Sequence, residues 1–304
     1  MATTRLQAKQ YIARALGAEG STVQLAAAQD ALFAAIEEWN LKRDWQFLLM
    51  DTTDGFSVAA CTGTGTTLDT TTSNGFIGVN PGQTVSGTGI TVGTTVSSIT
   101  DNDTIVLSAA STSVAATITF SGDIPLVVGT TTYNLPTPFK RPYTARVVSG
   151  DERTLDHMDQ RLIDRMYQDQ NTNGRSQFYN LMNKATFDQS RQNGKLRLFP
   201  PPSAIETVRV RYYRPIAQPS GDSVNLDLPD RYIYALLELG RWHYLKNHDS
   251  ETERLSLTQS KANELYTRCA ADDEGVTEDR EVVLVSQIDH AQSHIMVSDE
   301  LWWP

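Results

Sequence analysis

The middle of this chain lacks positive charge. Between Arg43 and Lys140 the sequence contains no lysine, arginine or glutamate, and the 304 residues together carry a formal net charge of −10. Because phosphate binding needs clustered lysine and arginine, this balance makes the chain a poor candidate for gripping DNA. It is compatible instead with a wall along which DNA slides without sticking.

The chain is also poor in cysteine and in long apolar runs. Its two cysteines, Cys61 and Cys269, lie far apart without metal-type spacing, so we expect two free thiols. No apolar run approaches the roughly 18–20 residues that span a bilayer. The first twenty residues have the pattern of an amphipathic helix rather than of a secretory signal. We therefore expect a globular protein that meets no membrane and works where it is made.

Recognised catalytic motifs are missing as well. The sequence has no Walker loop, CxxC, HExxH or GxSxG motif, and its Gly-Thr-Gly segments lack the strand, helix and distal acid of a dinucleotide-binding loop. Residues 57–122 contain no histidine that could activate their many serines. His290 and His294 are spaced i, i+4, but only Asp289 and Asp299 stand near as weak further ligands. We expect no catalysis, no cofactor and no metal.

Helical periodicity marks both ends of the chain. Apolar spacing predicts an N-terminal helix that stops near Gly17 and a second helix that begins with a capping box at Ser21 and Gln24. Asp227 as N-cap and Pro229 in the first turn predict the start of a long helix, followed by a second helical stretch. We therefore expect an α+β protein whose body is a helical bundle, made of an N-terminal helix hairpin and long C-terminal helices, with a β-hairpin or sheet region.

The middle of the chain has the composition of a small all-β module. Residues 57–122 are dominated by Thr, Ser, Gly, Ala and Val, with turn signals between short strands. The strand candidates are FIGV, QTVSG, TTVSSIT, DTIVLSA and AATITFSG. The predicted organisation is a body at 1–56 and 123–275, an inserted β domain at 57–122, and an extended C-terminal arm at 276–304.

Two strand-like sequences carry most of the clustered basic residues. Residues 194–202 are GKLRLFPPP, in which three prolines end a strand because proline offers no N–H to a ladder. Residues 208–216 are VRVRYYRPI, with apolar side chains on one face and arginines on the other. We expect one stiff hairpin, whose basic face is either solvated or in contact with an acidic subunit or passing DNA. Its basic residues are Lys195, Arg197, Arg209, Arg211 and Arg214.

Two large apolar rings, Trp302 and Trp303, lie within the last three residues of the sequence. Chain termini are normally polar and frayed, whereas tryptophan is enriched at interface hot spots. Both readings stay open here: the rings pack onto this chain's own core, or they insert into a pocket of a partner.

The order of these parts resembles the head-to-tail adaptor, or connector, proteins of tailed bacteriophages, especially the short-tailed podoviruses. The resemblance covers roughly residues 5–55 and 123–273. The segment at 57–122 departs from the pattern and looks like an inserted immunoglobulin-like decoration. The sequences that carry the resemblance are DWQFL, TTTYNLP, SQFYN, GKLRLFPPP, VRVRYYRPI and LDLPDRYIYALLELGRWHYL, in that order.

This resemblance implies a structural virion protein of the neck, made in the host cytoplasm, that joins the portal vertex to the tail. It implies a homo-oligomeric ring of twelve copies, with the portal protein and a tail nozzle or tail tube protein as partners and with genomic DNA passing through. It also implies that the basic hairpin meets the next ring or the DNA channel. The C-terminal arm would reach the portal through Ile295, Met296, Leu301, Trp302 and Trp303.

The alternative function is a virion-decorating protein that binds a receptor, tail fibres or tailspikes through the β module. Sugar-binding sites usually stack their ligand on exposed tryptophan or tyrosine. Residues 57–122 contain neither, which disfavours carbohydrate as the ligand.

Overall fold

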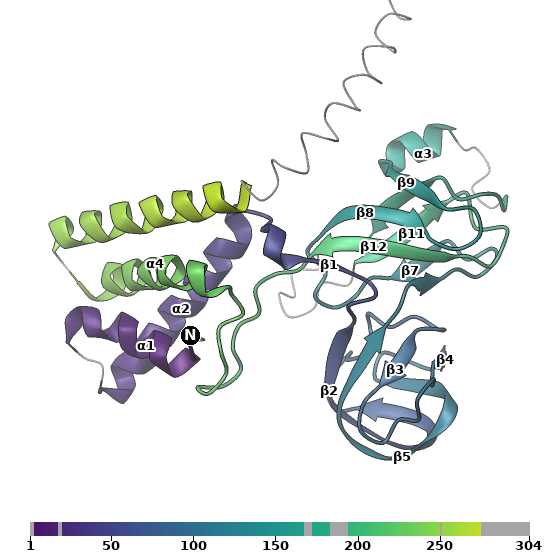
Figure 1. Ribbon diagram of the computed structural model, residues 1–304, viewed down its shortest axis with the longest axis horizontal. Helices are drawn as coiled ribbons and strands as arrows, with labels where there is room; N and C mark the ends of the chain where they lie inside the picture. The colour runs from purple at the N-terminus through teal and green to yellow at the C-terminus, as the bar shows by residue number, and fades with distance from the viewer. Residues whose placement is uncertain (1–2, 18–19, 167–171, 183–193, 250, 275–304) are drawn as a thin grey trace, which may run out of the picture. The chain divides into compact units, whose positions relative to one another are not determined.

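The structure of the protein is a computed structural model that describes residues 3–17, 20–166, 172–182, 194–249 and 251–274. The chain forms two compact units (Figure 1). We call Met1–Leu48 together with Ile216–Pro304 the helical unit, and Leu49–Pro215 the β unit. The predicted arm at 276–304 lies outside the described residues.

Four α-helices make up the described part of the helical unit. Two short 3-10 turns, η1 (Arg14–Leu16) and η2 (Gln46–Leu48), accompany them. None of the helices in the described ranges is long and apolar enough to cross a membrane. The four are α1 (Arg5–Ala13), α2 (Thr22–Lys42), α4 (Asp230–His248) and a helix at 252–274.

Local sequence signals set the ends of the N-terminal helices. Thr4 caps α1 in a reciprocal capping box with Gln7, which satisfies two N–H groups that would otherwise lack a partner. Gly17 ends η1 with φ +67°, a left-handed conformation that glycine adopts without a steric penalty; the predicted stop is confirmed. The Ser21 hydroxyl accepts the N–H of Gln24 at the start of α2.

The start of α4 differs from the prediction. The helix begins at Asp230 with Pro229 in the cap position, so the N-cap assigned to Asp227 is wrong. Leu228 precedes the proline, and a residue before proline is disfavoured in helical conformation. The Asp227 carboxylate accepts the N–H of Ala217 at 3.3 Å instead.

Aromatic rings fill the centre of the helical unit. The buried indoles of Trp39 and Trp45 stack with their centroids 4.9 Å apart. Tyr266, from the helix at 252–274, meets both rings edge-on. Because such pairs add about 0.5–1.5 kcal/mol beyond area burial, this cluster ties the last described helix to α2.

The β unit is built on an eight-stranded mixed sheet with the order β1-β12-β8-β9-β10-β11-β7, and β6 pairs with β12. Strands β9 and β10 are parallel, and the other neighbours are antiparallel. A parallel pair needs a crossover connection, and α3 (Gln160–Met166) lies in it. The strands are β1 (Leu49–Asp51), β6 (Ile124–Pro125), β7 (Thr132–Asn134), β8 (Arg141–Val147), β9 (Arg153–His157), β10 (Phe178–Met182), β11 (Lys195–Phe199) and β12 (Thr207–Tyr213).

This sheet curls around a single buried interior. The alternation predicted for β12 is confirmed: Val208, Val210 and Tyr212 are buried, whereas Arg209 and Arg211 are not. Successive side chains of a strand point to opposite faces, so the apolar positions of every strand meet inside. The interior also contains Ile124, Leu126, Tyr133, Leu135, Phe139, Ala145, Val147, Leu155, Tyr179, Leu196 and Leu198.

A second, four-stranded antiparallel sheet is inserted after β1 and has its own core. We call this part of the β unit, from β2 to β5, the module. Two long strands, β2 (Phe56–Thr70) and β5 (Thr104–Ser121), pair along most of their length. The short strands β3 (Thr84–Ser86) and β4 (Val96–Ile99) both pair with β5. Stacked Phe56 and Phe120 form part of its core.

The fold class expected from the sequence is wrong. The body is not a helical bundle, because helices are few and the large curled sheet dominates the β unit. Helix and strand account for similar shares of the residues that the structure describes, about 34% and 32%. The prediction gives the body only a β-hairpin or sheet region beside its helices, whereas the alternating apolar positions between residues 124 and 213 enclose a core of their own.

Candidate assembly site

The structure places the two basic strands apart in the sheet. Strand β11 pairs with β10 and β7, whereas β12 pairs with β8, β1 and β6. Three strands, β8, β9 and β10, therefore lie between them along the sheet. The connecting residues bond to other loops: Ser203 N–H donates to the Gly174 carbonyl, and Leu126 N–H donates to the Glu206 carbonyl. The five predicted basic residues do not share one hairpin.

The basic residues of β11 face outward from the curled sheet. Leu196 and Leu198 point into the interior, so Lys195 and Arg197 lie on the other face of the strand. The Arg197 guanidinium lies over the ring of Phe199, 4.6 Å from its centroid. This cation–π contact holds the guanidinium beside a buried aromatic ring, and Arg197 also donates to Gln160 Oε1 of α3 at 3.5 Å.

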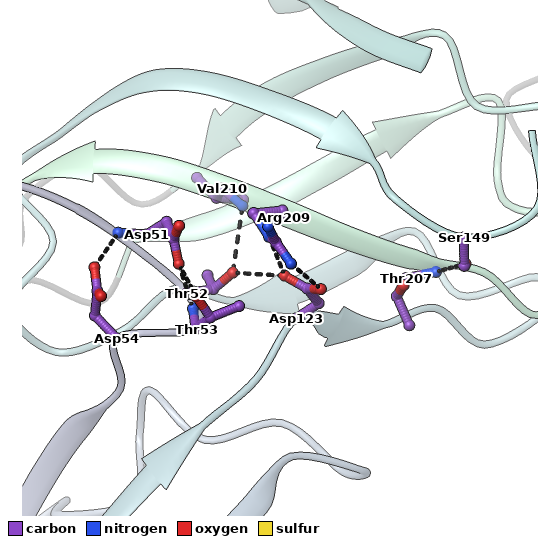
Figure 2. A network of polar contacts seen from close by, with 9 residues as sticks. All are labelled: Asp51, Thr52, Thr53, Asp54, Asp123, Ser149, Thr207, Arg209 and Val210. Atoms are coloured by element: carbon purple, nitrogen blue, oxygen red, sulfur yellow. Dashed lines mark hydrogen bonds and ion pairs between the residues drawn. The ribbon is translucent and has the colours of Figure 1, made fainter. Parts of the chain in front are cut away.

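Arg209 on β12 forms a two-point ion pair with Asp123 (Figure 2). Its Nε–H donates to Oδ1 at 2.9 Å, and an Nη2–H donates to Oδ2 at 3.0 Å. The hydrogen bonds to Asp123 raise the pKa of Arg209 above its ordinary value. Two parallel charge-assisted bonds fix orientation as well as distance. Asp123 immediately precedes β6, where the chain returns from the module.

Thr52 joins the same network from the other end of the module (Figure 2). Its N–H donates to the Val210 carbonyl at 3.1 Å, and its hydroxyl donates to Asp123 Oδ1 at 3.4 Å. The Gly122 N–H donates to the Thr52 carbonyl at 3.1 Å. The chain that leaves for the module and the chain that returns are therefore bonded to each other and to β12. We call Thr52, Asp123 and Arg209 the clamp.

A second set of hydrogen bonds, separate from the clamp, joins the module to the large sheet. The Asn134 N–H donates to Asn80 Oδ1 at 2.9 Å, and Asn80 Nδ2–H donates back to the Asn134 carbonyl at 2.8 Å. Asn134 Nδ2–H also donates to the Val79 carbonyl at 2.8 Å. At Gly78 a Cβ atom would lie only 2.8 Å from the Thr137 nitrogen, so glycine permits this close approach. We call Gly78, Asn80 and Asn134 the amide seam.

The remaining basic residues lie near the end of β12. Arg211 is exposed, and it is in register with Asp51 on β1. The Arg214 guanidinium, just beyond the strand, donates to the Pro215 carbonyl at 3.4 Å. Arg209 and Arg211 thus share β12, and Arg209 is the one whose charge is paired by the clamp. A role for these residues at a neighbouring ring or at DNA stays a prediction.

The helical unit contains a buried carboxylate, that of Glu238. The Tyr11 hydroxyl donates to Glu238 Oε1 at 2.5 Å, and Lys261 Nζ donates to the same oxygen at 3.0 Å. Burial by itself would raise the pKa of Glu238, but the hydrogen bonds from Tyr11 and Lys261 outweigh it and lower that pKa. Burial and the bond to Glu238 raise the pKa of Tyr11. Glu238 therefore links α1, α4 and the helix at 252–274.

Several predicted residues lie outside the described part of the chain. These are the portal-binding residues Ile295, Met296, Leu301, Trp302 and Trp303, and also His290 and His294. Within the described ranges, no three His, Cys, Asp or Glu side chains are grouped as a metal site requires. Cys61 and Cys269 are buried free thiols.

Sequence reasoning did not identify the hydrogen-bond acceptors of the clamp and of the amide seam. Asp123, Thr52 and Asn80 were not singled out, because single polar residues in a Thr-rich chain do not stand out. The available signal was position: Thr52 and Asp123 flank the segment of unusual composition. Polar side chains at the two boundaries of an insertion are candidates for joining its ends.

Comparison with known protein families matches residues 107–283 to the family described as SU10 adaptor protein. The matched stretch is more than half of the 304 residues and runs from β5 to beyond the helix at 252–274. No curated protein matches the chain. The chain is thus a phage adaptor-type structural protein. It belongs to the SU10 adaptor protein family.

Proposed function

We propose that this protein forms a ring at the neck of a short-tailed phage, joins the portal vertex to the tail, and surrounds the path of the DNA. The observation that carries the proposal is the adaptor-family match, which includes strands of the curled sheet and the C-terminal helices. An adaptor of this family interacts with other head or tail proteins of the phage. The proposed partners are the portal protein on one side and a tail nozzle or tail tube protein on the other, with twelve copies in the ring and no catalysis.

The net charge of the protein supports a channel through which DNA passes rather than a site that binds DNA tightly. The net charge is −10, and the clamp neutralises Arg209 with Asp123. Each phosphate contact needs a cation that is available to the nucleic acid. A wall with few such cations holds DNA weakly, which suits a channel through which a genome must move.

We assign portal binding to the C-terminal arm through Ile295, Met296, Leu301, Trp302 and Trp303. Large apolar rings such as those of tryptophan are enriched at interface hot spots and suited to insertion into a pocket of a partner. The test is co-sedimentation of the full chain with the portal ring of the same phage, beside a variant lacking residues 297–304 and a control lacking only Pro304.

We expect the full chain and the Pro304 control to bind the portal equally. The longer deletion should keep its circular dichroism spectrum and lose portal binding. Unchanged binding by the longer deletion would overturn the anchor assignment. Failure of the full chain to bind the portal would overturn the neck position itself.

A second candidate function, contact with a receptor, tail fibres or tailspikes through the module, is supported by one feature. The module has an open groove of about 390 Å³, lined by Thr62, Gly63, Thr64, Thr67, Asp69 and Val114. Because the clamp and the amide seam hold the module to the sheet, such a groove would be presented in a fixed orientation. If the module has this function, replacing Thr62 and Thr64 by lysine is expected to abolish fibre binding and to leave portal binding unchanged.

A further inference from the structure

Three asparagine–glycine pairs occur in the sequence, and one of them lies in the module. Asn74 and Gly75 belong to the turn that follows β2. In such a pair the glycine nitrogen can attack the side-chain carbonyl carbon of the asparagine, because glycine has no Cβ atom to shield that nitrogen. The product is a five-membered cyclic imide, which water opens to aspartate or isoaspartate. In a folded protein, the groups around the pair decide whether this reaction is fast or slow.

The fold requires each residue of this pair for a separate reason. Asn74 has φ +53°, a left-handed conformation that asparagine adopts more readily than most residues with a side chain. At Gly75, a Cβ atom would lie 2.6 Å from Thr70 Cγ2 and 3.0 Å from the Thr72 carbonyl oxygen, so a side chain has no room there. The asparagine–glycine sequence at this turn therefore follows from packing, and its chemistry comes with it.

The attacking nitrogen donates its hydrogen to a carboxylate. The Gly75 N–H is shared between the Thr72 carbonyl, at 2.9 Å, and Asp103 Oδ1, at 3.2 Å. Of these two acceptors, only the carboxylate can take the proton. A carboxylate within hydrogen-bond reach of the proton that it removes meets the geometric requirement for a general base.

The carbonyl group that receives the attack is bound by a donor from the same loop as Asp103. Asn102 Nδ2–H donates to Asn74 Oδ1 at 3.0 Å. Negative charge develops on this oxygen as the ring closes, so a positioned N–H group stabilises the transition state. Asn102 is exposed, so water has access for the later opening of the ring. We call Asn74, Gly75, Asn102 and Asp103 the cyclisation site.

Backbone hydrogen bonds hold the two loops of the cyclisation site together. The Phe76 N–H donates to the Asn102 carbonyl at 2.8 Å, and the Thr70 N–H donates to the Asp103 carbonyl at 2.9 Å. Phe76 is also buried in the core of the module. The base, the nucleophile and the carbonyl donor are therefore held on one scaffold, and such positioning is a major source of rate acceleration.

We propose that Asn74 is a self-modification site, at which the module converts this asparagine to aspartate and isoaspartate without another enzyme. The Gly75 nitrogen forms a bond to Asn74 Cγ while Asp103 takes its proton, and Asn102 stabilises the resulting oxyanion on Oδ1. The tetrahedral carbon then expels the amide nitrogen, which leaves as ammonia with the proton that Asp103 returns. Water opens the ring. The reaction adds a negative charge beside Asp103, and the isoaspartate product also lengthens the backbone of the turn.

A second asparagine–glycine pair in the same chain is an internal comparison. The Gly174 N–H, which follows Asn173, donates to the Pro201 carbonyl at 2.8 Å, an acceptor that cannot take a proton. Asn173 is exposed. Accessibility alone would therefore make Asn173 the faster of the two, whereas the cyclisation site makes Asn74 the faster. Asn193, in the third pair, lies outside the described residues.

The test follows the full chain at neutral pH and constant temperature over several weeks. Chymotrypsin releases a peptide that ends at Phe76, which trypsin cannot do because residues 44–139 contain no lysine or arginine. Mass spectrometry detects the change of amide to carboxyl in each peptide, and labelling by an isoaspartyl methyltransferase identifies isoaspartate. The variants are D103N, which keeps an oxygen acceptor but removes the base, and N102A, which removes the carbonyl donor. The control is D69N, which removes an exposed acid of the module.

In wild type and D69N, Asn74 is expected to react faster than Asn173. D103N and N102A should each slow the reaction at Asn74 by at least about tenfold, since general bases and oxyanion donors typically contribute a hundredfold or more. The rate at Asn173 should be the same in all four proteins, so it serves as the standard within each sample.

Two results would overturn the proposal. One is a wild-type protein in which Asn74 reacts no faster than Asn173, which would mean that the hydrogen bonds protect the pair. The other is reaction at Asn74 in D103N as fast as in wild type or faster. Hydrogen exchange of β5 peptides shows whether each variant keeps the module folded, and N102A decides the outcome if D103N loosens the module.

Discussion

The clamp offers a direct test of how the module is held. Replacing Arg209 by methionine keeps most of the side chain's length and removes both hydrogen bonds to Asp123. Asp123 then keeps only the Thr52 hydroxyl, at 3.4 Å. The partner variant is Asp123→Asn, and the double variant R209M/D123N completes a cycle that isolates the energy of the pair.

The expected magnitude follows from the exposure of the two side chains, 34% for Arg209 and 16% for Asp123. Exposed ion pairs contribute about 0–1 kcal/mol, and breaking a fully buried pair costs about 3–5 kcal/mol. This pair lies between the two limits, so each single variant should destabilise the β unit by about 2 kcal/mol, with a coupling energy of about 1–2 kcal/mol. In a unit of this size that corresponds to a fall of about 4–8 °C in melting temperature.

The positions of the tryptophans allow the unfolding of the two units to be followed separately. All five tryptophans, Trp39, Trp45, Trp242, Trp302 and Trp303, lie outside Leu49–Pro215. Tryptophan fluorescence therefore follows the helical unit. The β unit is followed by hydrogen exchange of peptides from β5, β6 and β12, measured by mass spectrometry against urea concentration.

The matched control is Arg211→Met on the same strand, because Arg211 is exposed and not part of the clamp. It should change stability by no more than about 0.5 kcal/mol. A coupling energy below about 0.5 kcal/mol, or equal effects of R209M and R211M, would refute the reasoning that the clamp holds the module.

Two further predictions concern the units separately. The lowered pKa of Glu238 means that its contribution to stability is present above its ordinary value of 4.5 and is lost as pH falls through the lowered value. Glu238→Gln should therefore flatten the acid side of the curve of the helical unit's stability against pH, followed by tryptophan fluorescence. Asp273, whose pKa burial raises, acts in the opposite sense, so the measured quantity is the difference in stability between variant and wild type. Parallel curves for the two proteins would contradict the assignment. Replacing residues 57–122 by a short Gly/Ser linker should leave the tryptophan transition of the helical unit in place, and loss of that transition would show that the helical unit depends on the module.

Local features of the fold could be predicted from the sequence because they depend on neighbouring residues. The stop at Gly17 requires only a left-handed residue after a helical turn. The alternation along β12 requires only a period of two, and it correctly separated Val208 and Val210 from Arg209 and Arg211.

Strand pairing could not be predicted in the same way. β11 and β12 follow each other in the chain, which favoured a hairpin, yet three strands separate them in the sheet. The predicted strands DTIVLSA and AATITFSG both fall almost entirely within the single strand β5, and FIGV lies in a turn region. The long partner β2 was missed because its Gly- and Thr-rich sequence has few of the apolar residues that mark a strand.

The candidate site was out of reach for a related reason. Asp123 and Arg209 are 86 positions apart in the chain, and no local pattern connects them. A basic residue seen in a sequence has an unknown counter-charge, so its availability to DNA or to a partner is decided by tertiary structure. Arg209 was predicted as part of a basic surface, and the fold pairs it with an acid.

Because the clamp and the amide seam are both made of polar groups, they fix the orientation of the module. Two chain connections alone leave an inserted sheet free to rotate about the axis through them, and apolar packing fixes orientation only loosely. The clamp and the amide seam instead use hydrogen bonds whose donors and acceptors match in one arrangement, and Thr52 and Asn80 are buried at them. Buried polar groups are costly when unpaired, so any rotated arrangement would leave several of them without partners. The module and the curled sheet should therefore move as one body, and whatever the module contacts in the virion is positioned by the sheet.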